Sequence, residues 1–107
     1  MPITTANDLP GYEIRETLGE VFGLTVRSRN LGSQLGASLK SIVGGELKGL
    51  TRALTDSREQ VIERMVAAAE EKGADAIVAK RFDTSEMGGT WTEIVAYGTA
   101  VKARKAL

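Results

Sequence analysis

The sequence contains neither cysteine nor histidine. The absence of cysteine excludes disulfide bonds, thiolate metal sites and cysteine nucleophiles. The absence of histidine removes the side chain that most often serves as a general base and as a ligand for transition metals. A soft or borderline heavy metal would therefore find neither a thiolate nor an imidazole ligand in this chain.

The sequence also lacks an excess of charge of either sign, since 14 basic residues balance 14 acidic residues. Proteins that bind nucleic acids usually carry a basic excess, because neutralising phosphates supplies much of their affinity. Binding to an anionic membrane surface needs a similar excess. We therefore expect neither a nucleic acid nor a membrane as a partner. A neutral chain does not repel copies of itself, so self-association is favoured.

Long apolar runs are absent as well. No 18 consecutive apolar residues occur, so no segment is expected to span a bilayer. The first 12 residues lack the basic start and apolar run of a signal peptide, and we expect a cytoplasmic protein. The 107 residues suit one domain, at 1–107, and with only five aromatic residues its core must consist mostly of Leu, Ile, Val and Ala.

The first part of the chain has the pattern of a β-structure. Apolar and polar residues alternate from 12 to 28, which predicts one long strand or a pair of strands. Gly19 and Gly23 within it predict a bulge or a bend. Residues 3–5 favour a short strand, and the cluster at 7–11 predicts a turn.

The middle of the chain has helical spacing. We predict a loop at 29–33 and then a helix that ends or kinks at Gly44-Gly45. A second apolar stripe of period 3.6 predicts a helix over 46–72, and a capping-box sequence permits a break at 55–56. Gly73 is typical of a helix C-cap.

Two further strands are predicted near the C-terminus. The apolar run at 76–82 suits a strand buried on both faces, and residues 84–89 predict a turn. The segment 90–102 is apolar or small on both faces, so both faces need a cover. We expect helices on one face and a second subunit on the other. The whole order predicts an α+β fold, with an antiparallel or mixed sheet packed on two helices.

Polar residues within these apolar segments are the candidates for function. Glu16, Glu20 and Glu93 could form an acid–base pair or an oxygen-ligand metal site, although a solvated or salt-bridged edge is the more common role for such residues. Arg81 and Asp83, at the end of a buried strand, could hold an anion, a neighbour's carboxylate or a structural salt bridge. Neither a phosphate loop nor a dinucleotide-binding motif occurs, so no catalytic residue, metal ligand or cofactor is identified.

Several blocks along nearly the whole chain occur in a distinctive order. They are Pro10-Gly11-Tyr12, Gly44-Gly45-Glu46-Leu47, Gly73-Ala74-Asp75-Ala76-Ile77, Arg81-Phe82-Asp83 and the run Glu93-Ile94-Val95-Ala96-Tyr97-Gly98-Thr99-Ala100-Val101. Together they resemble the YbjQ-like family, which is uncharacterised and carries a heavy-metal-binding label. The resemblance implies a dodecin-like α+β subunit that assembles into a homopentameric ring.

These observations lead to one main hypothesis and two alternatives. The main hypothesis is a non-enzymatic homo-oligomer that binds a small ligand or a metal ion at its subunit seams, through Glu46, Arg81, Asp83 and Glu93. These polar residues lie inside otherwise apolar blocks that match the family. The first alternative is an enzyme of unknown substrate, with Glu93 as base and Arg81 as electrophilic partner at a subunit seam. The second is a purely structural or adaptor oligomer.

Overall fold

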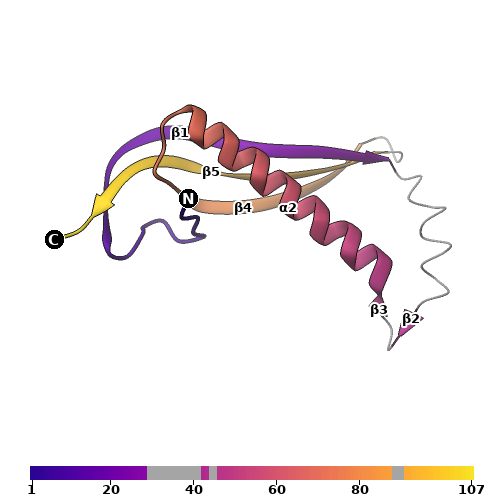
Figure 1. The fold of residues 1–107 in the computed structure, drawn as a ribbon. Helices are drawn as coiled ribbons and strands as arrows, with labels where there is room; N and C mark the ends of the chain where they lie inside the picture. Colours follow the sequence, from indigo (N-terminus) through magenta and orange to yellow (C-terminus); the bar gives the residue numbers. More distant parts are fainter. Residues whose placement is uncertain (29–41, 44–45, 88–90) are drawn as a thin grey trace.

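The computed structural model describes residues 1–28, 42–43, 46–87 and 91–107. These residues form a three-stranded antiparallel sheet, one long helix and a small two-stranded ladder (Figure 1). The elements are β1 (Tyr12–Ser28), β2 (Ile42–Val43), β3 (Glu46–Leu47), α2 (Lys48–Glu71), β4 (Ala76–Met87) and β5 (Trp91–Lys105). The strand order in the large sheet is β1-β5-β4. The predicted α+β class is confirmed, with one helix against the sheet in the described part of the chain.

Strand β1 has the alternation that the sequence predicts, and it pairs with β5 along its whole length. The pairing register shifts twice, after Ile14 and before Gly19. Gly19 has a φ of 99°, which glycine adopts without steric cost. The predicted irregularity at Gly19 is therefore confirmed, and it bends the long strand.

The second glycine of β1 has a different role from the one predicted. Gly23 lies within a regular stretch of the ladder, directly under α2. A Cβ atom at this position would overlap the carbonyl oxygen of Val61 and lie 2.6 Å from the backbone nitrogen of Met65. Gly23 is thus a point of close approach between strand and helix.

Helix α2 is continuous from Lys48 to Glu71, so the break that the sequence permits at 55–56 does not occur. The helix begins later than predicted, because Glu46 and Leu47 belong to β3. Its end is as predicted: Gly73 has a φ of 75°. The backbone N–H groups of Gly73 and Ala74 donate to the carbonyl oxygens of Glu70 and Ala69, the two bonds of a Schellman motif.

The first predicted helix falls mostly on residues outside the described part of the chain. Its last two residues, Ile42 and Val43, are described and form β2, which pairs with β3. The prediction is wrong for these two residues. Both are β-branched, which favours a strand once a partner strand is available.

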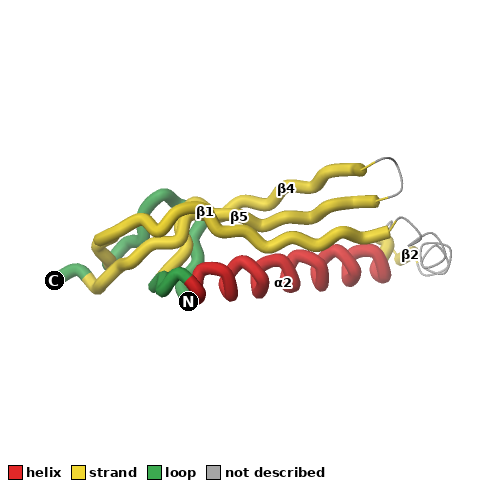
Figure 2. The backbone as a smooth tube through the Cα atoms, turned by 90° about the horizontal axis from the view of Figure 1, so that it is seen from above, coloured by secondary structure: helices red, strands yellow, loops and turns green. Residues whose placement is uncertain are grey.

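One face of the sheet packs against α2 and forms the core (Figure 2). The apolar stripe of the helix meets small and branched residues of β1 and β5. The fully buried members are Val21, Val61, Met65, Ala69, Ile77, Ala96 and Ala100. The helix is further attached to β1 by Arg64, whose Nη1 donates to the Leu24 carbonyl oxygen at 2.6 Å.

Strand β4 is longer than predicted, since Thr84 to Met87 continue the strand where a turn was expected. It contains a bulge between Val78 and Arg81, at which Ala79 has a φ of 53°. The N-terminal segment pairs with β4 beside this bulge, in parallel, through a bridge between Ile3 and Ile77. The prediction of β-structure at 3–5 is confirmed for Ile3.

The opposite face of the sheet has its own cover at one end. Ala76, Val78 and Val101 form a second buried cluster, against which Leu9 and Ile14 pack. The sequence prediction assigned the cover of this face to another subunit. At this end the prediction is wrong, because the N-terminal segment of the same chain supplies the cover.

No described helix is long and apolar enough to cross a lipid bilayer.

Candidate functional site

We use the term outer face for the side of the sheet opposite α2. Beyond the bulge of β4, the outer face carries Arg81 and Asp83, whose partners on β5 are Tyr97 and Val95. On β1 it carries the even-numbered residues from Glu20 onward, because the odd-numbered ones face the helix. The bulge determines this placement. Val78 and Arg81 share the outer face although they are three residues apart.

Large apolar side chains on the outer face are exposed. Their exposed fractions are 52% for Phe22, 37% for Leu24, 47% for Val26 and 49% for Trp91. The three β1 residues follow one another at spacing two, so they form one continuous stripe. Exposed apolar stripes of this kind are common on surfaces that pack against another molecule.

A polar cluster lies beside this stripe, centred on Tyr97. The Tyr97 hydroxyl donates a hydrogen bond to Asp83. That bond and the charge of the Asp83 carboxylate raise the pKa of Tyr97 above its ordinary value of 10.0, and desolvation adds to the rise. The positive charge of Arg81 lowers the pKa of Tyr97, and the negative charge of Glu20 raises it. Four polar side chains from three strands therefore interact at this point.

Arg81 has a structural role within this cluster. Its Nη1 atom donates to the carbonyl oxygens of Thr5 and Lys80, both at 2.8 Å. The side chain thus holds the N-terminal segment against the bulge of β4. A guanidinium group has five N–H donors, and the others have no acceptor among the residues that the structure describes, so they can bind a further acceptor.

The structure brings some of the predicted site residues together and separates others. Arg81 and Asp83 are neighbours on the outer face, and Glu93, opposite Ser85, lies further along the same face. Glu93 is four residues from Tyr97, the partner of Arg81, which corresponds to about 13 Å along a strand. Glu46 lies in β3, next to the start of α2. A Glu93–Arg81 catalytic pair within one copy is therefore not formed.

Sequence reasoning missed Tyr97 as a site residue. The signal was present, because Tyr97 is a hydroxyl-bearing residue between the small residues Ala96 and Gly98. What the sequence could not show is that Asp83 lies diagonally across the ladder, within reach of the hydroxyl.

The described residues define a small α+β protein, with a three-stranded antiparallel sheet that has one helix on one face and an exposed apolar stripe on the other. Residues 1–104 match the YbjQ_1 family, described as "Putative heavy-metal-binding". The chain belongs to this YbjQ-like family, as its resemblance to the family predicted.

Relatives in other organisms match over nearly the whole chain. The UPF0145 protein of Acidothermus cellulolyticus is 61% identical, over 98% of this chain and 97% of the relative. The UPF0145 protein of Enterococcus faecalis is 52% identical, over 95% of this chain and 98% of the relative. The UPF0145 protein of Sulfurisphaera tokodaii is 47% identical, over 98% of this chain and 92% of the relative.

A solved structure shares the fold. It is a protein of unknown function from Pediococcus pentosaceus that belongs to the DUF74 family, and it superimposes with a TM-score of 0.63. The two chains are 16% identical, and the match covers 97% of this chain and 98% of the other.

The heavy-metal description of the family does not fit the residues of this chain. The sequence supplies no cysteine thiolate and no imidazole. Among the described residues, no three Asp or Glu side chains are grouped so that they could hold an ion. Carboxylate and hydroxyl oxygens suit hard cations rather than heavy metals.

Proposed function

We propose that this chain functions as a homopentamer that covers the apolar stripe of its outer face with a second copy. The exposed stripe of Phe22, Leu24, Val26 and Trp91 is the observation that carries the proposal. Each of these residues would bury more apolar surface in an assembly, at about 25 cal/mol per Å².

The dimensions of the chain support the same proposal. Its radius of gyration is 17.2 Å, and it extends over 55 × 31 × 18 Å. A compact domain of about this length has a radius of gyration near 13 Å. A long, thin subunit buries less surface within itself, and association restores the missing burial. The net charge of zero imposes no electrostatic penalty on that association.

We further propose that the seams between copies bind a small ligand or an ion through the polar cluster of the outer face. Arg81, Asp83 and Tyr97 lie beside the apolar stripe, and Glu93 lies further along it. A second copy over the stripe would remove water from these groups, which strengthens their interaction with a bound ion or polar ligand. Glu46 lies in β3, at the N-terminal end of α2, so it would join such a seam only from another copy.

Native mass spectrometry and sedimentation velocity test the assembly. A homopentamer of 11.4-kDa chains has a mass of about 57 kDa. Trp91, the single tryptophan, lies on the outer face and reports its burial by a blue shift of its emission. A monomer at every concentration, with emission that does not change on dilution, would overturn the proposal.

The seam site has its own test. Mg²⁺ and inorganic phosphate are titrated separately while the Trp91 emission is recorded. We expect a saturable change with one of the two probes. A change with Mg²⁺ should be lost in Asp83→Asn, a change with phosphate should be lost in Arg81→Gln, and either should be kept in Asp56→Asn, which removes an exposed carboxylate of α2 instead. No saturable change with either probe, or a change that these variants do not alter, would refute a site at this cluster.

A further inference from the structure

A groove opens on the opposite side of the sheet, between the first half of α2 and the strands β4 and β5. Its volume is about 440 Å³. It is lined by Thr51, Leu54, Thr55, Arg58, Thr84 and Ile94. We call it the helix groove. Its volume lies within the range of sites that bind small molecules, and its lining combines apolar side chains with a few polar groups, as such sites do.

The hydroxyl groups of the helix groove can accept hydrogen bonds from a ligand. The Thr55 hydroxyl donates to the Thr51 carbonyl oxygen at 2.9 Å, which leaves its lone pairs free. The hydroxyls of Thr51 and Thr84 have no hydrogen bond to any residue that the structure describes. These two can therefore donate to a ligand as well as accept from it.

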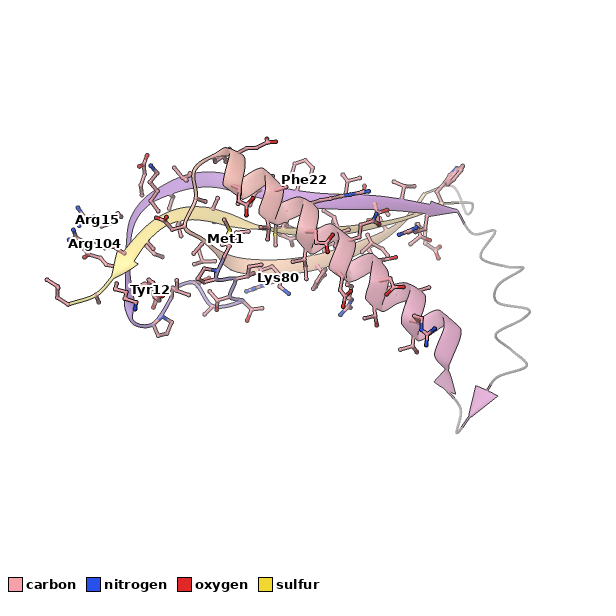
Figure 3. The ribbon with its side chains drawn as sticks, in the orientation of Figure 1. Met1, Tyr12, Arg15, Phe22, Lys80 and Arg104 are labelled. Atoms are coloured by element: carbon pink, nitrogen blue, oxygen red, sulfur yellow. The ribbon has the colours of Figure 1, made fainter. Side chains whose placement is uncertain are left out.

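The groove also carries positive charge. The Arg58 guanidinium lies over the ring of Phe82, with its Cζ atom 4.8 Å from the ring centroid. The ammonium of Lys80 lies 4.2 Å from the same centroid, so the two charges are within about 9 Å of each other. Figure 3 shows Lys80 on the sheet beside the middle of the helix.

Among the residues that the structure describes, no carboxylate forms an ion pair with Arg58 or Lys80, whereas Glu13 pairs with Arg15 and Arg104. Contact with the Phe82 ring restricts the Arg58 side chain but uses none of its N–H donors. The guanidinium of Arg58, which lines the groove, therefore offers N–H donors to an anion, and the charge of Lys80 near the same ring adds to the attraction.

We propose that the helix groove binds a small organic oxyanion, with Arg58 holding its carboxylate or phosphate group and Lys80, which does not line the groove, adding positive charge nearby. Leu54 and Ile94 contact the apolar body of the ligand, and the threonine hydroxyls orient it. This site goes beyond the proposed function, because it lies on the other face of the sheet and uses none of the outer-face residues.

The test uses isothermal titration calorimetry and amide chemical shifts on the full chain, with phenyl phosphate and benzoate as probes. The relative affinities of phenyl phosphate and benzoate show whether the groove prefers a phosphate or a carboxylate group. Inorganic phosphate has the charge without the apolar body, and benzyl alcohol has the apolar body without the charge. We expect saturable binding of at least one aromatic anion, at least tenfold tighter than either fragment, with shifts at Thr51, Thr84 and Ile94.

Variants then assign the residues. Arg58→Gln should weaken binding at least tenfold, and Lys80→Gln about threefold. Arg52→Gln, which removes an exposed cation from the same helix outside the groove, should leave it unchanged. Thr84→Leu narrows the groove without changing a charge and should also weaken binding. Thermal unfolding of each variant shows that it is folded.

Several results would overturn the proposal. They are the absence of saturable binding by both aromatic anions, equal binding of phenyl phosphate by Arg58→Gln and the wild-type protein, and equal affinity for benzyl alcohol and the anions. Shifts confined to the outer face would assign the anion to the seam instead. A protein that stays monomeric would refute the proposed assembly but leave this test intact.

Discussion

Replacing Phe22 by alanine tests the proposed assembly most directly. Phe22 is 52% exposed, and a phenylalanine side chain presents about 200 Å² in an unfolded chain, so about 100 Å² remains for a second copy to cover. At 25 cal/mol per Å², and allowing for the area of the alanine itself, each seam loses about 2 kcal/mol. This corresponds to a dissociation constant about 30-fold higher at each seam.

The assay is a dilution series of the wild-type protein and the variant, followed by sedimentation velocity and by Trp91 emission. The midpoint of dissociation should move to a higher protein concentration in Phe22→Ala. Leu54→Ala is the matched control, because Leu54 is 49% exposed but lies on α2, away from the outer face. Urea unfolding of both variants separates a weakened seam from a weakened fold.

Two outcomes would refute the reasoning. If Phe22→Ala assembles at the same concentration as the wild-type protein, the apolar stripe is not the seam. If Leu54→Ala dissociates instead, the copies associate through the helix side of the sheet, and the outer face has another role.

Three further predictions concern the fold itself. In urea titrations, Gly23→Ala should lower the free energy of unfolding by at least about 3 kcal/mol, because the added methyl group overlaps the helix backbone. Gly11→Ala is the control: the methyl group has open space there, and the φ of 85° alone should lower the free energy of unfolding by about 1 kcal/mol. Tyr97 has a raised pKa, so the stability from its bond to Asp83 is present below pH 10 and lost as the pH rises through the folded-state value. Tyr97→Phe should remove that alkaline loss in a plot of stability against pH, and an unchanged loss would assign it to other groups. Met65→Ala, at a fully buried site, should cost about 2–5 kcal/mol by thermal unfolding.

The local parts of the fold were predictable from the sequence. The alternation of apolar and polar residues predicted β1, and the apolar stripe with a period of 3.6 residues predicted most of α2. The C-cap at Gly73 was predictable too, because glycine adopts the left-handed conformation of that cap without cost. Each of these features depends on residues close to one another in the chain.

Features that depend on partners distant in the sequence were not predictable. The sequence could not show that β4 continues to Met87, because β5 lies alongside and pairs with it. It could not show that the N-terminal segment pairs with Ile77 and covers part of the outer face. Nor could it show the helix groove, which depends on where α2 lies over the sheet.

By itself the sequence determined the class of the protein, its family and the chemistry that it lacks. The tertiary structure alone decided which face the polar residues occupy. If β4 were regular, Arg81 would share a face with Ile77 and lie under the helix. The bulge at Ala79 adds a residue to β4, and so it turns Arg81 and Asp83 to the outer face beside Tyr97. Because side chains alternate along a strand, one extra residue, visible only in the pairing with β5, determines where the candidate site lies.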